Sequence, residues 1–151
     1  MGKANKPESK IFNFQIKSVE LIKQNLELPE TKINPITSFN FNIGVEQKLD
    51  YKNKLLIVIT HVEITPTENL DLKLGSASVA CVFSIENFEE VIKSDKKGVP
   101  HVDEIITQTL NSISISTSRG VLSQVFKGTF LHQAVLPVLD PKAFKAAPIA
   151  E

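Results

Sequence analysis

The chain has 151 residues, 42% of them hydrophobic and 23% charged, which is typical of a folded protein with one core. Seventeen basic and seventeen acidic residues cancel, so no bulk charge would draw the chain to nucleic acid or to an anionic membrane. The single cysteine excludes an internal disulfide. No apolar run reaches the roughly 20 residues that span a bilayer. We expect a cytoplasmic protein with a folded domain at 11–146 between two flexible tails, 1–10 and 147–151.

The first expected element is a long strand, Ile11 to Leu28. Phe12, Phe14 and Ile16 share one face of this strand, whereas Val19 and Leu21 share the other. An extra residue in a strand moves the following side chains to the opposite face. The pattern therefore predicts a β-bulge near Lys17 and Ser18.

Three further strands are expected. Thr37 to Leu49 alternates apolar and polar residues, which indicates one buried and one wet face. Leu55 to Ile64 begins apolar on both faces, as central strands do, and Gly75 to Ile85 alternates again. Polar turns at Asp50 to Asn53 and Pro66 to Asn69 join them. The short turns predict that the four strands form an antiparallel meander.

The spacing of apolar residues then becomes helical. Residues 86–101 indicate a helical turn and a charged loop, and the acids Asp103 and Glu104 favour a helix start. The segment 112–118, SISISTS, is ambiguous: its alternation favours a strand, whereas continuity with its flanks favours a helix. Gly120 would cost a helix about 1 kcal/mol relative to alanine, unless close packing requires it.

The end of the chain combines a helix stop with an apolar loop. Gly128 follows the helical pattern where a left-handed cap would end it. Pro137 keeps the apolar loop extended because proline is excluded from a helix interior. Asp140 can cap a last short helix, with Pro141 at its first position and Phe144 on it. Such a loop and helix need an apolar surface to cover.

Three stretches, in this order, carry a resemblance to a known family. They are FQIKSVELIKQNLELP at Phe14–Pro29, VACVFSIENFE at Val79–Glu89 and RGVLSQVFKGTFLHQAVLPVLDPKAF at Arg119–Phe144. Together they resemble the protein-export chaperone SecB and its SecB-like relatives, over about residues 11–146. The resemblance implies an α+β fold: a four-stranded antiparallel sheet with a long helix and a short C-terminal helix packed on one side. It also implies a helix at 112–118 and a homotetramer built as a dimer of dimers.

The resemblance implies an ATP-independent holdase that binds unfolded polypeptides in an apolar groove, without a cofactor. One long and one short helix can cover only one face of such a sheet. The remaining apolar surface must be buried by another subunit or serve for binding. The candidate groove residues are Leu26, Leu28, Phe39, Phe41, Ile43, Phe83, Ile85, Leu136, Val138 and Phe144. The candidate residues of the oligomer interface are Ile106, Leu110, Ile113, Thr117 and Val121.

The chain also departs from the family. The long acid-rich surface with which general export chaperones meet the translocation motor is not evident, because Asp71, Glu86, Glu89 and Glu90 are scattered. The alternative is therefore a dedicated chaperone or adaptor of a single partner, such as an antitoxin. Arg119 lies about one residue nearer the helix stop than the arginine of the family, so no role is transferred to it.

The polar residues do not indicate an enzyme or a metal site. His61, His101 and His132 are far apart, and none has a ligand residue four positions on. Cys81 alternates with core residues and is expected to be a buried structural thiol. The serines of 112–118 have no paired base and are expected to form a helix face that packs closely. A small-molecule carrier or enzyme that uses the same apolar cleft is the rival from another class.

Overall fold

The computed structural model describes residues 13–27 and 38–140. Four strands form one antiparallel sheet: β1 (Phe14–Leu26), β2 (Phe39–Asp50), β3 (Leu55–Pro66) and β4 (Gly75–Ile85). The bounds of β4 are those predicted, and those of β2 and β3 differ by at most two residues.

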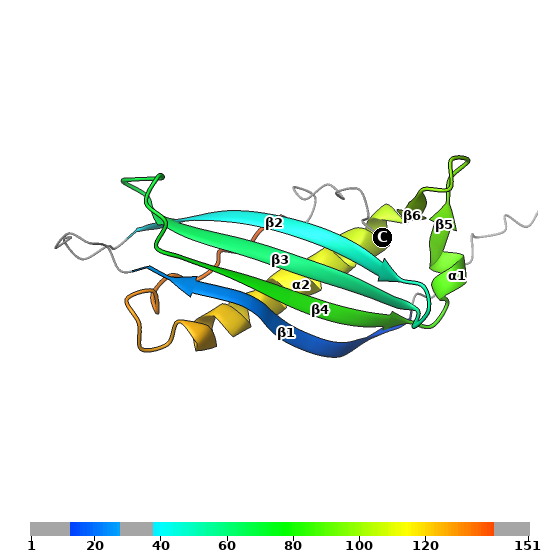
Figure 1. The fold of residues 1–151 in the computed structure, drawn as a ribbon, viewed down its shortest axis with the longest axis horizontal. Coiled ribbons are helices and arrows are strands. Elements are labelled where there is room, and N and C mark those ends of the chain that lie inside the picture. Colours follow the sequence, from blue (N-terminus) through cyan, green and yellow to red (C-terminus); the bar gives the residue numbers. More distant parts are fainter. Residues whose placement is uncertain (1–12, 28–37, 141–151) are drawn as a thin grey trace, which may run out of the picture.

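The long helix α2 (Glu104–Val125) crosses one face of the sheet obliquely (Figure 1). This confirms the α+β class with the helix packed on one side. In the described part of the chain, no helix is both long and apolar enough to cross a membrane. The predicted C-terminal helix with Pro141 and Phe144, the two tails and Leu28 lie outside the described residues.

The strand order corrects the predicted meander. The order is β1-β4-β3-β2, so β1 pairs with β4 and not with β2. The short-turn argument holds for the three consecutive strands β2, β3 and β4. It fails between β1 and β2, where the chain from Glu27 to Ser38 is longer than a hairpin turn. Both β1 and β2 are consequently edge strands.

Two bulges keep the apolar residues of β1 on one face. The register shifts between Ile16 and Ser18, which confirms the predicted bulge, and shifts again between Leu21 and Lys23, which was not predicted. Between and beyond the shifts, the apolar residues of β1 pair with positions of β4 whose side chains face α2. These pairs are Phe14 with Ile85, Ile16 with Phe83, Val19 with Cys81, Leu21 with Val79 and Leu26 with Gly75.

Helix α2 begins at the predicted acids and continues through the ambiguous segment. Asp103 caps it: its Oδ1 accepts a hydrogen bond from the backbone N–H of Ile105 at 2.9 Å. Residues 112–118 are helical, and Ser114 and Ser118 are fully buried, so the small residues form the tightly packed face. Gly128 has a φ of 78°, in the left-handed region expected of a helix stop.

The predicted charged loop at 86–101 is more structured than its composition suggested. It holds the short helix α1 (Phe88–Val91) and the hairpin of β5 (Ile92–Ser94) and β6 (Pro100–Val102). Asp95 stabilises the turn, because its Oδ1 accepts the N–H groups of both Lys97 and Val99. The buried apolar residues at the two ends of this unit close one end of the core.

Two apolar clusters form the core between α2 and the sheet. The first comprises Leu49, Leu56, Val58, Cys81, Phe83, Ile85, Phe88, Ile92, Val102 and Leu110. The second comprises Val62, Ile64, Leu74, Ala77, Ile115, Leu122, Phe126, Leu131, Ala134 and Leu136. Polar side chains are buried between them: Gln47 Nε2 donates to Asn111 Oδ1 at 2.9 Å, and Thr60 Oγ1 has no partner among the described residues. Burial raises the pKa of the Cys81 thiol, as expected of a structural cysteine.

Candidate functional site

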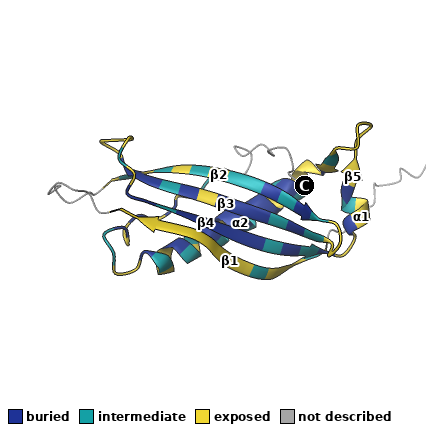
Figure 2. Ribbon diagram, in the orientation of Figure 1, coloured by how far each residue is buried: buried dark blue, intermediate teal, exposed yellow. Residues whose placement is uncertain are grey.

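The helix side of β1 carries an uncovered row of apolar side chains. Ile16, Val19, Leu21 and Leu26, here named the β1 row, are each between 36% and 46% exposed. Ile22, at the second bulge, is 55% exposed. Figure 2 shows the contrast between the exposed residues along β1 and the buried residues of β3 and β4. Contiguous exposed apolar residues on a folded protein usually mark an interaction site.

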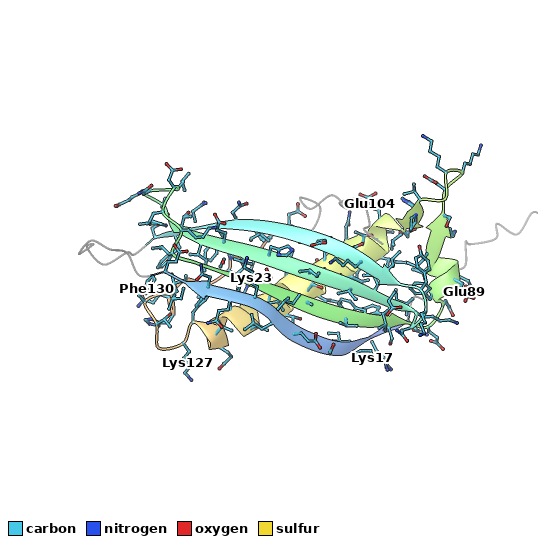
Figure 3. All side chains as sticks on the ribbon, in the orientation of Figure 1. Lys17, Lys23, Glu89, Glu104, Lys127 and Phe130 are labelled. Atoms are coloured by element: carbon cyan, nitrogen blue, oxygen red, sulfur yellow. The ribbon has the colours of Figure 1, made fainter. Side chains whose placement is uncertain are left out.

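The path of α2 explains why this row is bare. The helix packs on the two central strands, β3 and β4. Its buried residues recur three or four positions apart and form one stripe, which can cover only the strands beneath it. Lys17 and Lys23 project from β1 beside the two bulges (Figure 3). Lys23 pairs with Ser78 and lies on the face away from α2, so the β1 row on the helix side is an apolar strip.

On the opposite edge, β2 carries a second row that the chain itself covers. Phe39, Phe41 and Ile43, the β2 row, are half-buried and pack against the second core cluster. This cluster also includes residues from the end of the chain, Leu131–Leu139, here named the closing segment. Leu131, Ala134 and Leu136 are buried there, and Leu139 packs against the same cluster.

Arg119 fastens the closing segment to α2. Its Nε donates to the carbonyl of Leu136 at 2.7 Å, and its Nη2 donates to the carbonyl of Pro137 at 2.9 Å. At the start of β4, a Cβ added to Gly75 would lie 2.6 Å from Leu131 Cδ1, so Leu131 packs directly on this glycine and a larger residue would have to displace its side chain. No pattern in the sequence indicates this role of Arg119, because the role depends on carbonyl groups 17 and 18 residues away.

The face of the sheet away from α2 is polar around His61. His61 lies between Ser78 Oγ, 2.7 Å from its Nδ1, and Glu46 Oε2, 3.1 Å from its Nε2. The hydrogen bond with His61, aided by the charge of Lys48, holds the pKa of Glu46 below its usual value. His61, Ser78 and the ion pair of Lys73 with Glu63 border a shallow open pocket.

The contact between Ser78 and His61 does not make an acyl-transfer site. Ser78 lies within β4, which pairs with β1 on one side and β3 on the other. Strand pairing engages the backbone N–H groups that would otherwise stabilise an oxyanion. The arrangement is a hydrogen-bonded surface chain that ties β2, β3 and β4 together.

The structure divides the predicted groove residues into three groups. Leu26 and Val138 are exposed, and the β2 row is half-buried. Phe83, Ile85 and Leu136 are buried in the core, so within one protomer they lie beneath the surface. Leu28 and Phe144 lie outside the described residues. Ile16, Val19 and Leu21 were not among the predicted site residues. The change of parity along the first strand and the edge position of β1 are the features that mark them.

The predicted interface residues lie along α2. Leu110 is fully buried in the first core cluster of the protomer. The other four are half-buried: Ile106, Ile113, Thr117 and Val121. Gly120 is on the exposed side of the helix, and a Cβ added to it would meet nothing within 4 Å. Nothing within the described protomer therefore requires glycine at this position.

The fold is similar to that of a SecB-like chaperone from Mycobacterium tuberculosis in complex with a ChAD peptide from the HigA1 antitoxin. The two structures share 12% sequence identity and a TM-score of 0.54, over 83% of this chain and 87% of that chain. A protein of unknown function from Streptococcus agalactiae aligns with a TM-score of 0.42 and 8% identity, over 78% of this chain and 90% of that one. No family model and no curated protein matches the sequence. At this identity the likeness shows the fold, and the fold is the one that the resemblance to SecB-like proteins implies.

Proposed function

We propose that this protein is an ATP-independent chaperone that holds non-native polypeptides in an extended form along the helix side of β1. The observation that carries the proposal is the β1 row, an apolar strip on an edge strand that α2 leaves uncovered. The similarity of the fold to a SecB-like chaperone supports it. The proposal includes no catalytic residue and no cofactor.

The energetics of such binding favour several weak contacts. Each apolar client side chain that is well buried contributes about 1.5–3 kcal/mol, whereas ordering the client costs several kcal/mol. One short contact is therefore weak. The homotetramer expected from the family, a dimer of dimers, would present several strips and make the later contacts intramolecular. A row of aliphatic side chains without a fixed polar pattern would accept many sequences.

A dedicated chaperone of one partner is the second candidate, and the charges on the strand favour it over coupling to an export motor. Lys17, Glu20 and Lys23 of β1 are of mixed sign, rather than a run of acids. The similar mycobacterial protein is described with a peptide from an antitoxin. Co-purification separates the two: one stoichiometric partner supports the dedicated role, and a mixture of many proteins supports the general one.

The proposal predicts that the protein suppresses aggregation of an unrelated unfolded protein without nucleotide. Leu21→Asp places a charge in the β1 row and should weaken client binding at least about tenfold. This corresponds to the roughly 1.4 kcal/mol or more lost when one apolar contact becomes a desolvated charge. Light scattering during dilution of the client from denaturant measures the suppression.

Gln15→Asp is the matched control, because it adds the same charge to the same strand on the face opposite the row. It should suppress aggregation as well as the unmodified protein does. Far-UV circular dichroism checks that both variants keep the fold. Absence of suppression by unmodified protein in molar excess, or equal suppression by Leu21→Asp, would contradict the proposal.

A further inference from the structure

We infer that the pocket on the face of the sheet away from α2, here named the outer pocket, is a binding site for a small polyhydroxy carboxylate of the sugar-acid class. The pocket lies on the opposite face of the sheet from the β1 row, and the inference does not rest on the proposed function. Its volume of about 340 Å³ falls in the range of about 300–1,000 Å³ that is usual for small-molecule sites.

The outer pocket exists because neighbouring strands carry small residues at matched positions. Ser78 of β4 lies opposite His61 of β3, and His61 lies opposite Gly44 of β2. A Cβ added to Gly44 would meet nothing within 4 Å, so the space above this glycine is open. Ser76 and Ser78 also border the pocket, and each adds only a hydroxymethyl group. A shallow pocket lined by polar groups suits a ligand that is rich in hydroxyls.

The charges around the outer pocket favour a ligand with one negative charge. Lys73 is paired with Glu63 at 3.1 Å, whereas Lys23 forms no ion pair with a described residue. With His61 neutral, two lysines and one glutamate leave one net positive charge in the lining. A single charge matches one carboxylate better than a doubly charged phosphate group. Lys23 is therefore the residue that we expect to bind the carboxylate.

The hydrogen bonds of His61 determine what Ser78 offers to a ligand. The carboxylate of Glu46 can only accept, so Nε2 of the neutral His61 ring carries the proton at 3.1 Å from Glu46 Oε2. Nδ1 then accepts the hydroxyl proton of Ser78 at 2.7 Å. The Ser78 oxygen and the Glu63 carboxylate are left as acceptors beside the pocket, and the hydroxyls of a polyhydroxy ligand supply the donors that they need.

The test uses the isotope-labelled full-length chain and sodium gluconate, at constant ionic strength. We expect saturable changes in the backbone amide chemical shifts of Gly44, Ser76 and Ser78, and none at Gly98 in the β5–β6 hairpin. Sorbitol has the same carbon chain and hydroxyls without the carboxylate, and hexanoate has the carboxylate without the hydroxyls. Each should bind at least about tenfold more weakly than gluconate, because each loses one class of contact.

Two lysine variants test the assigned role of Lys23. Lys23→Gln should weaken gluconate binding at least about tenfold, because it removes the charge that pairs with the carboxylate. Lys93→Gln is the matched control: it removes the same charge from β5, which does not border the outer pocket, and should leave the affinity unchanged. Equal gluconate affinity in the two variants overturns the inference.

Gly44→Val tests the pocket itself by filling it. The added Cβ meets nothing within 4 Å, and valine suits a strand, so this variant should keep the fold and lose gluconate binding. Urea unfolding checks its stability, and the lysine variants decide the question if that stability falls. Unchanged gluconate affinity in folded Gly44→Val, or equal affinity of the unmodified chain for gluconate and sorbitol or for gluconate and hexanoate, overturns the inference.

Discussion

The two edge strands of the sheet carry comparable apolar rows on the same face, and the chain covers them unequally. The β2 row is half-buried beneath the closing segment, whereas the β1 row is 36–46% exposed. Side-chain hydrogen bonds to α2 also differ between the two edge strands. Gln47 of β2 is hydrogen-bonded to Asn111 of α2, and no side-chain hydrogen bond joins β1 to α2 in the described part of the chain.

The difference shows that the path of the connecting elements, and not the sequence of each strand, decides which apolar row is covered. Helix α2 lies over the two central strands. The closing segment is hydrogen-bonded to Arg119 and shares the second core cluster with the β2 row. The edge strand β1, which these elements do not cover, keeps apolar surface in contact with water. That surface is available to a second chain. The comparison can be tested by making equal changes on the two sides.

The largest expected difference is in unfolding free energy, between a leucine-to-alanine change in the covered core and the same change in the exposed β1 row. Leu122→Ala removes a side chain that is 3% exposed in the second core cluster, and should cost about 2–5 kcal/mol of unfolding free energy. Leu21→Ala removes one that is 41% exposed on β1, and should change the unfolding free energy by less than about 1 kcal/mol. Urea unfolding at low protein concentration measures both.

A large loss in Leu21→Ala that grows with protein concentration would break the comparison. It would mean that a second copy covers the β1 row in solution, because stability gained by association depends on concentration. A loss in Leu122→Ala below about 1 kcal/mol would show that the second cluster is loosely packed, and would contradict its full burial.

The next effect concerns the hydrogen bond that joins β2 to α2. Gln47→Met keeps the length of the side chain but leaves Asn111 Oδ1 buried without its donor, which should cost about 1–3 kcal/mol. Thr60→Val is the control at a neighbouring buried position. Its hydroxyl has no partner in the described structure, so the change should be neutral or stabilising by up to about 1 kcal/mol. If both variants lose equal stability, the Gln47–Asn111 bond is not what distinguishes β2 from β1.

Gly120→Ala tests the outer side of α2 and should be stabilising. Glycine in a helix interior costs about 1 kcal/mol relative to alanine, and the added Cβ would meet nothing within 4 Å. We expect a gain of about 1 kcal/mol in thermal or urea unfolding. A loss instead, with a smaller particle in analytical ultracentrifugation, would show that another subunit packs closely on this side.

The sequence predicted the parts of the fold that depend on local pattern. Strand periodicity located β2, β3 and β4, and the change of parity located the bulge between Ile16 and Ser18. Pattern alone left 112–118 undecided, because its alternating serines and isoleucines fit a strand as well as a helix. The family resemblance supplied the helix that the structure confirms.

What the sequence did not predict depends on contacts between distant segments. The place of β1 beside β4, the hold of Arg119 on Leu136 and Pro137, and the cover over β2 all join residues far apart along the chain. Apolar periodicity reports which residues avoid water, and it does not report which of them another element will cover. For this reason Phe83 and Ile85, which are buried, could not be distinguished in advance from Val19 and Leu21, which are exposed.

The smallest expected effect is a pH dependence that belongs to the β2 side. The pKa of Glu46 is lowered, chiefly by its hydrogen bond with His61, so the folded state favours the carboxylate. A carboxyl group with a depressed pKa stabilises the fold above the ordinary glutamate pKa of about 4.3, and this contribution is lost as the pH falls through the lower folded value. Glu46→Gln should therefore be less stable than the unmodified chain by about 0.2–1 kcal/mol near pH 6, the range for cross-strand pairs. The difference should vanish toward pH 3. Urea midpoints across this range measure it, and a difference that persists unchanged at pH 3 would assign the effect to packing instead of charge.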